Sequence, residues 1–144
     1  MIVIKKVKAE DTYQIRKSIL RKGMTLSHEM SGDKEPETLH LGLFESGELV
    51  CIGSFMKSSK KIFNGVQYQL RGMASVASAQ GKGFGKLLLE DAEEKLKNQG
   101  VEILWCNART VALGFYKKLG YQIVGDVSQV EQVGPHFVMF KKLL

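Results

Sequence analysis

The sequence predicts a single mixed α/β domain built around one, mostly antiparallel sheet. Short apolar segments of strand length alternate with a few amphipathic segments of helix length over 144 residues. Most of the predicted strands follow one another through short turns, which favours antiparallel pairing. No linker rich in Pro, Gly or Ser and no internal repeat divides the chain, so we expect one domain over residues 1–144. A doubly wound sheet is not predicted.

In the first half of the chain, the patterns predict a strand, a helix, a loop and three further strands. Apolar and polar residues alternate in the first strand, and Gly23 ends the helix. The loop contains Glu29, Asp33, Glu35 and Glu37, and a short helix could precede it. The predicted ranges are 2–7, 10–23, 24–38, 39–57 (two strands about a tight turn at 45–48) and 65–77.

The second half is predicted as a helix, a buried strand, a shorter helix and two strands. The first helix buries a face of five residues and ends at Gly100: Phe84, Leu87, Leu88, Ala92 and Leu96. The apolar run 101–107 is typical of a strand buried on both faces. A short helix follows, with apolar positions from Ala108 to Leu119, and strands at 121–127 and 135–143 close the chain. The strands that flank the first of these helices are expected to be parallel with a right-handed crossover.

Composition and charge exclude several classes of function. The formal net charge of +6 comes from scattered Lys and Arg pairs without interleaved aromatic residues, so no nucleic-acid partner is predicted. No apolar run is long enough to cross a membrane, and the N-terminus becomes charged too early for a signal peptide, so we expect a cytoplasmic protein without a membrane partner. Cys51 and Cys106 lie in apolar runs and are predicted to be free buried thiols. No Cys/His cluster predicts a metal site.

The segment Gly81-Lys82-Gly83-Phe84-Gly85-Lys86 predicts an anion-binding turn, because glycines precede an amphipathic helix and follow a strand. A Walker loop is excluded, since Gly81 and Gly85 are one residue too close and Leu87 stands where Ser or Thr is needed. The dinucleotide pattern Gly-x-Gly-x-x-Gly fails because Lys86 occupies its third glycine position.

The turn matches the pattern Gln/Arg-x-x-Gly-x-Gly/Ala from Gln80 to Gly85, and in this it resembles the coenzyme A pyrophosphate loop of the GNAT superfamily of N-acetyltransferases. Three further segments are similar to that family: "YQLRGMAS" (68–75), "NARTVALGFYKKLGY" (107–121) and "GPHFVMFK" (134–141). The order of strands and helices also matches over essentially the whole chain. One small departure is Ala77, where the family often has Pro.

The resemblance implies a GNAT-like sheet of about seven strands that splays between the fourth and fifth, with helices on both faces. It further implies acetyl transfer from acetyl-coenzyme A directly to a primary amine. Pyrophosphate would be bound at Gln80, Gly81, Lys82, Gly83, Phe84, Gly85 and Lys86, and the pantetheine arm along the backbone of Met73, Ala74 and Ser75. An amide at Ala74 or Ser75 would stabilise the thioester oxyanion.

Tyr116 occupies the family's general-acid position and would protonate the leaving thiolate, although spacing alone also fits a core aromatic residue. Asn107 would contact the pantetheine arm or order the strand end, or would be a helix N-cap. Cys106 is interpreted as a buried strand residue, since direct attack by the amine needs no covalent nucleophile.

The sequence alone does not decide which residues bind and deprotonate the acceptor amine. The base candidates are His28, Glu29, His40, Glu48 and His136. The acidic loop 29–37 could attract a cationic amine or be solvated surface, and Arg71 could pair with a carboxylate of the protein or of the substrate. The acceptor is expected to be a small molecule or a peptide, and the protein a monomer or a homodimer. The alternative function is a non-catalytic acyl-coenzyme A binding or sensing module.

Overall fold

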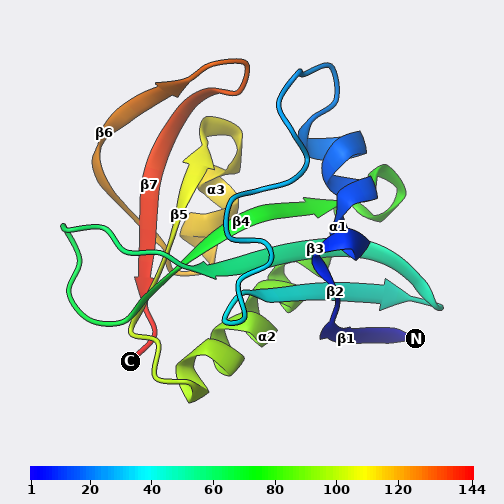
Figure 1. Ribbon diagram of the computed structural model, residues 1–144, viewed down its shortest axis with the longest axis horizontal. Coiled ribbons are helices and arrows are strands. Elements are labelled where there is room, and N and C mark those ends of the chain that lie inside the picture. Colours follow the sequence, from blue (N-terminus) through cyan, green and yellow to red (C-terminus); the bar gives the residue numbers. More distant parts are fainter.

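The computed structural model describes residues 1–144 and contains one seven-stranded mixed sheet, which confirms the predicted fold class (Figure 1). The strands lie in the order β1-β2-β3-β4-β5-β7-β6. Their bounds are β1 Ile2–Lys6, β2 Leu39–Glu45, β3 Glu48–Lys57, β4 Gln67–Ser75, β5 Ile103–Arg109, β6 Gln122–Val130 and β7 Gly134–Lys142. All neighbouring strands are antiparallel except β4 and β5, which are parallel and are joined through a helix.

Helices cover both faces of the sheet. Helix α1 (Ala9–Ile15) continues into a π-helical turn, Arg16–Leu20, and packs through Ile15 on Ile52 and Ala74. Helices α2 (Phe84–Asn98) and α3 (Leu113–Lys118) contribute to the larger core on the opposite face, which also contains Cys51 and Phe55. Because successive strand residues point to opposite faces, Cys51 and Ile52 of β3 belong to different cores.

Two details of the predicted helices were wrong. Leu87 is 43% exposed, whereas Leu89 is buried. The buried side of α2 is formed by Leu89 and by residues spaced four apart: Phe84, Leu88, Ala92 and Leu96. The second helix does not begin at Ala108, since β5 stays paired with β7 as far as Arg109. Helix α3 starts at Leu113, so Asn107 is a strand residue and not its N-cap.

The sheet splays between β4 and β5. Their parallel pairing covers only Gln67 to Leu70 against Ile103 to Cys106. Just beyond that point β4 contains a bulge opposite Gly53, and Gly72 adopts a left-handed φ of 65° there. The outer half of β4 therefore separates from β5, and an open cleft lies between the two strands.

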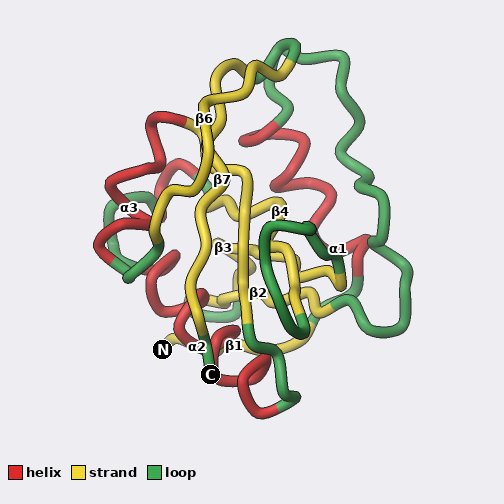
Figure 2. The backbone as a smooth tube through the Cα atoms, turned by 90° about the vertical axis from the view of Figure 1, so that its left-hand side faces the viewer, coloured by secondary structure: helices red, strands yellow, loops and turns green.

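Two distant segments meet beside this cleft. The turn between β6 and β7 approaches the loop that follows α1, and Figure 2 shows the hairpin reaching across toward that loop. The Gln132 side-chain oxygen accepts a hydrogen bond from the Thr25 amide at 2.8 Å, and its nitrogen donates one to Thr25 Oγ1 at 2.8 Å.

Cys51 and Cys106 are free and buried, as predicted. No helix is long and apolar enough to span a membrane. No group of three or more His, Cys, Asp or Glu side chains is close enough together to hold a metal ion.

Candidate active site

The glycine turn before α2 presents a row of free backbone amides. None of the amides from Gly81 to Lys86 donates a hydrogen bond to another group of the protein. Gly81 and Gly83 have φ values of 81° and 80°, and a Cβ at either position would meet nothing within 4 Å. Left-handed glycines next to a helix N-terminus direct amides outward, and the first turn of α2 contains no acidic residue. This turn fits a diphosphate.

The side chains around the turn have separate roles. Gln80 Nε2 donates to the carbonyl of Ser75 at 3.0 Å, which ties the turn to the end of β4. Lys82 Nζ lies 3.6 Å from Glu45 Oε1, in an exposed ion pair. Phe84 is buried in the core, so only its backbone is available to a ligand. A Cβ at Gly85 would approach Phe115 to 3.2 Å, so this glycine permits close packing of α2 against α3.

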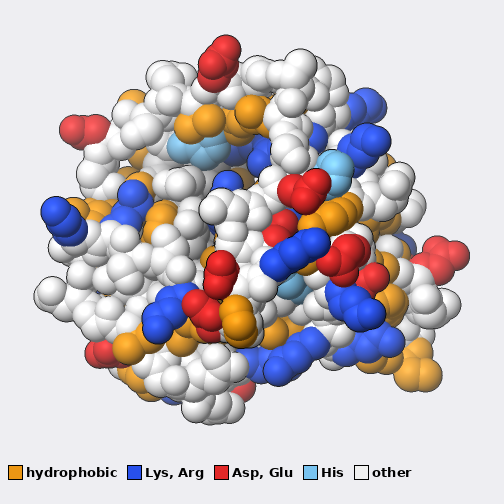
Figure 3. Space-filling view, viewed as in Figure 1, with side chains coloured by type: hydrophobic (Ala, Val, Ile, Leu, Met, Phe, Trp, Pro, Cys, Tyr) orange, Lys and Arg blue, Asp and Glu red, His pale blue; other side chains and the backbone are white.

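The cleft between β4 and β5 has a volume of about 630 Å³. It brings together many of the residues that the sequence singled out: Glu29, Arg71, Met73, Asn107, Tyr116 and His136. Ala74 and Ser75 follow Met73 on β4 but do not line the cleft. In Figure 3 histidine and basic side chains lie in the hollow on the β7 side of the molecule.

Tyr116 is a buried residue of the cleft lining. Its side chain is 8% exposed and packs edge-on against Phe115 and Tyr121, with ring centroids 5.0 and 5.6 Å away. Burial, together with the neighbouring Cys106 thiol, raises the pKa of Tyr116, so its hydroxyl stays protonated at neutral pH. Burial likewise raises the pKa of Cys106 to about 12, so this thiol stays protonated at neutral pH.

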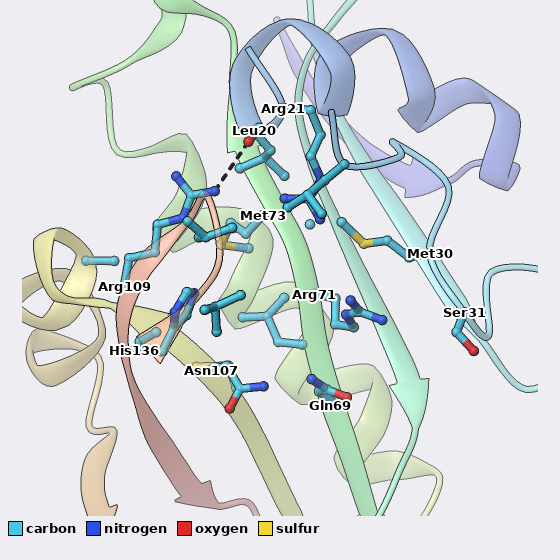
Figure 4. A pocket seen from close by; sticks show the side chains of 18 of the residues that line it. Leu20, Arg21, Met30, Ser31, Gln69, Arg71, Met73, Asn107, Arg109 and His136 are labelled. Carbon is cyan, nitrogen blue, oxygen red and sulfur yellow. Dashed lines mark hydrogen bonds between the residues drawn. The ribbon is translucent and has the colours of Figure 1, made fainter. Parts of the chain in front are cut away.

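Three arginines line the cleft from different segments (Figure 4). Arg21 follows α1, Arg71 lies on β4 and Arg109 ends β5; we call these the arginine cluster. None of them forms an ion pair with a carboxylate. Arg21 Nε donates to the Ser27 carbonyl at 3.0 Å, and Arg109 Nη2 donates to the Leu20 carbonyl at 3.3 Å.

The charges of the arginine cluster repel one another. Burial and the neighbouring Arg109, Arg71 and Arg16 charges lower the pKa of Arg21. Burial and Arg16 lower the pKa of Arg71, although Asp33 opposes this. Arg71 faces the cleft. The sequence left two partners open for it, a carboxylate of the protein or one of the substrate, and it forms no ion pair with a carboxylate of the protein. The cleft therefore holds three guanidinium groups that form no ion pair within the protein.

The structure places two of the five candidate bases in the cleft and three outside it. His136 and Glu29 line the cleft. His136 Nδ1 lies 2.9 Å from the Gly134 carbonyl, so Nδ1 donates this hydrogen bond and Nε2 is the acceptor nitrogen of the neutral ring. None of the other three lines the cleft. His40 is buried and bonded through both ring nitrogens, Glu48 lies exposed at the start of β3, and His28 packs edge-on against Tyr13.

Sequence reasoning missed Arg21 and Arg109. Arg21 sits beside Lys22 in a predicted helix end, where a basic residue is ordinary, and Arg109 was expected within a helix. Only Arg71 gave a signal, as a charge inside an apolar strand. The cluster is assembled by the sheet topology, which joins segments far apart in the chain.

Comparisons with known proteins agree with this geometry. Residues 5–144 match the family described as Acetyltransferase (GNAT) domain. An uncharacterized N-acetyltransferase of Bacillus subtilis (strain 168), YitI, is 37% identical over 145 residues, which cover 99% of this chain and 97% of that protein.

Two solved structures are similar in fold. An aminoglycoside 6'-N-acetyltransferase complexed with coenzyme A gives a TM-score of 0.78 at 16% identity, over 99% of this chain and 97% of that one. Escherichia coli ElaA gives a TM-score of 0.81 at 16% identity, over 98% and 99% of the two chains. The family match and the Bacillus subtilis relative show that the chain is an acetyltransferase. The chain belongs to the GNAT family and is an acetyl-coenzyme A-dependent N-acetyltransferase.

Proposed function

We propose that this enzyme acetylates the primary amine of a small molecule that also carries an anionic group, such as a carboxylate or a phosphonate. The observation that carries the proposal is the arginine cluster: Arg21, Arg71 and Arg109 line one cleft without an acidic partner. Guanidinium groups bind carboxylate and phosphate oxygens in bidentate geometry. An acceptor anion would supply the counter-charge that the cleft lacks.

Acetyl-coenzyme A supplies the acetyl group. Its pyrophosphate would be held by the amides of Gly81 to Lys86, with Gln80 fixing the turn. The backbone of Met73, Ala74 and Ser75 lies where β4 has left β5, so its groups on that side are available to the pantetheine arm and to the thioester oxygen. Asn107, at the facing edge of β5, is exposed and would contact the same arm.

Two side chains of the cleft are suited to the proton transfers. The amine must lose a proton to attack, and His136 Nε2 is free to accept it. Tyr116 keeps its proton because burial raises its pKa, and its hydroxyl would donate that proton to the departing sulfur. No covalent bond to the enzyme is needed.

The charge of the cleft argues against a cationic acceptor, which the acidic loop 29–37 had suggested. Asp33 of that loop is already paired with Arg16, and Glu29 is the single carboxylate in the cleft lining, against three arginines. Like charges placed together without solvent are costly, so a polyamine or a lysine-rich peptide would be a poor acceptor.

A thiol-release assay with a matched panel tests the proposal. The panel pairs each amino acid and aminophosphonate with its neutral amide or ester, and adds polyamines and short basic peptides. The anionic member of each pair should have a kcat/KM at least roughly tenfold higher, the factor typical of one charge-assisted hydrogen bond. Equal rates within pairs, or a preference for polyamines, would refute anion recognition. Coenzyme A binding without thiol release from any amine would instead favour a non-catalytic acyl-coenzyme A binding module.

A further inference from the structure

A buried ion pair lies directly behind the cleft. The side chain of Arg16, in the π-helical turn after α1, is fully buried. Its Nη1 and Nη2 donate to the two carboxylate oxygens of Asp33 at 2.7 and 2.9 Å. Nη2 also donates to Ser54 Oγ at 2.9 Å, and Nη1 to the His28 carbonyl at 3.0 Å. The Asp33 carboxylate accepts a further bond from the Met30 amide at 2.8 Å.

This pair lies next to Arg71 on the same face of the sheet. Ser54 of β3 is the cross-strand partner of Arg71, so their side chains are neighbours. A Cβ at Gly72 would lie 3.1 Å from Arg16 Nε, which places the guanidinium against the bulge of β4. Asp33 is the acidic residue whose charge acts on Arg71, since it raises the pKa of Arg71 against burial and Arg16.

We propose that Arg16 is a positioning residue that leaves Arg71 free for the acceptor anion, because it occupies both oxygens of Asp33. This inference rests on the proposed function, since it assumes that Arg71 binds the acceptor. The pair thus divides four arginines into one that is neutralised within the protein and three that are available to a ligand.

The inference follows from what a lone buried carboxylate does. If Arg16 becomes Met, Asp33 loses its ion-pair partner in a buried site, and a carboxylate that stays ionised there favours pairing with another guanidinium. Arg71 is the neighbouring guanidinium and has no ion pair of its own. If Arg71 paired with Asp33, it would no longer be free to bind the acceptor anion. If Asp33 becomes Asn instead, Arg16 loses its partner but Arg71 stays free.

Removing one or the other half of this ion pair is therefore predicted to affect Arg71 differently, which a purely structural role does not give. The first readout needs no acceptor: the rate at which phenylglyoxal modifies Arg71, followed by peptide mass spectrometry on the folded protein. Modification of Arg71 should slow roughly tenfold in Arg16→Met, because pairing with a carboxylate lowers the reactivity of a guanidinium. It should stay within about twofold of wild type in Asp33→Asn and in the double variant Arg16→Met/Asp33→Leu.

The second readout is kinetic. The KM for an anionic amine should rise roughly tenfold in Arg16→Met and return toward the wild-type value in the double variant, with the KM for acetyl-coenzyme A unchanged throughout. Circular dichroism checks that each variant is folded; if Arg16→Met is not, Arg16→Gln replaces it and carries the same predictions.

Arg71 modification that is unchanged in Arg16→Met, or equally slowed in Asp33→Asn, would overturn the inference. A modification pattern as predicted, without any change in acceptor KM, would show that Arg16 keeps Arg71 unpaired but would refute the assignment of Arg71 to the acceptor. The failure of the inference and the failure of the proposed function are thereby distinguishable.

Discussion

The two sides of the cleft use different parts of the chain to meet their ligands. On the cofactor side, the turn Gly81–Lys86 offers backbone amides, and its one nearby ion pair, Lys82 with Glu45, is exposed. On the acceptor side, Arg21, Arg71 and Arg109 offer side-chain charge. Backbone geometry can hold a pyrophosphate whatever the surrounding side chains, whereas recognition by side chains changes with single substitutions. Under the proposed function, the second side would therefore determine which amine is acetylated.

The largest effect is expected where a side chain blocks the backbone site. Gly83→Val places a β-branched residue at a φ of 80° and covers the amides of the turn. Coenzyme A affinity should fall by at least roughly a hundredfold, the equivalent of two charge-assisted hydrogen bonds, as measured by calorimetry.

Gly125→Val is the matched control for that change. Gly125 also has a left-handed φ, 76°, and open space around its Cβ position, but it lies in β6 outside the cleft lining. It should cost comparable backbone strain and leave coenzyme A affinity intact. Wild-type affinity in a folded Gly83→Val variant would contradict the assignment of the turn.

The next effect concerns Tyr116, the proposed proton donor. Tyr116→Phe should lower kcat by ~10²-fold or more, the range for general acid catalysis, without changing coenzyme A affinity. Tyr121→Phe serves as a control, because Tyr121 is also buried but its hydroxyl donates a hydrogen bond to Glu93 Oε2 at 2.7 Å. That variant should lose stability by ~1–3 kcal/mol yet keep kcat. Unchanged kcat in Tyr116→Phe would remove the acid role.

Low pH should weaken the Arg16–Asp33 ion pair, which lies next to Arg71 on the acceptor side. Burial alone would raise the pKa of Asp33, but the hydrogen bonds from Arg16 and Met30 outweigh it, and the net pKa lies below its ordinary value. A lowered pKa stabilises the fold above the unfolded-state value of about 4, and this contribution is lost as pH falls through the lowered value.

Asp33→Asn should therefore be less stable than wild type at pH 7 and show a smaller loss of unfolding free energy between pH 7 and pH 3, measured by urea denaturation. Glu48→Gln, which removes an exposed carboxylate that makes no ion pair, should follow the wild-type curve. Parallel curves for wild type and Asp33→Asn would show that Asp33 is not held ionised by Arg16.

The smallest effect is expected at the contact between the two loops beside the acceptor side. Gln132→Asn keeps an amide and tolerates the left-handed φ of 67°, but its side chain is too short for both bonds to Thr25. Hydrogen exchange at the Thr25 amide should accelerate, while acceptor KM changes by less than about threefold, because exposed hydrogen bonds contribute little. Unchanged exchange at Thr25 would contradict the contact; Gln129→Asn is the control.

The same contrast explains what could be predicted from sequence. The cofactor side is local: a strand, a glycine turn and a helix follow one another, so Gln80 to Lys86 were found together by their spacing. Tyr116 and Asn107 were identified by resemblance to the GNAT family. Asn107 as an N-cap was wrong, because pairing of β5 with β7 extends the strand past it.

The acceptor side could not be predicted in the same way. Arg21, Arg71, Arg109 and His136 come from four segments whose proximity depends on the sheet order and on where β4 and β5 separate. Local patterns carry no information on such long-range pairing. The Arg16–Asp33 pair was missed for the same reason, since Arg16 and Asp33 are ordinary charges in their own segments.

One measurement tests the central claim that side-chain charge at the cleft selects the acceptor. It compares kcat/KM for an anionic amine and for its neutral amide, in wild type and in Arg71→Gln. We predict that wild type prefers the anion at least roughly tenfold and that Arg71→Gln loses most of this preference while its rate with the amide is retained. An equal preference for the anion in both proteins would contradict the account.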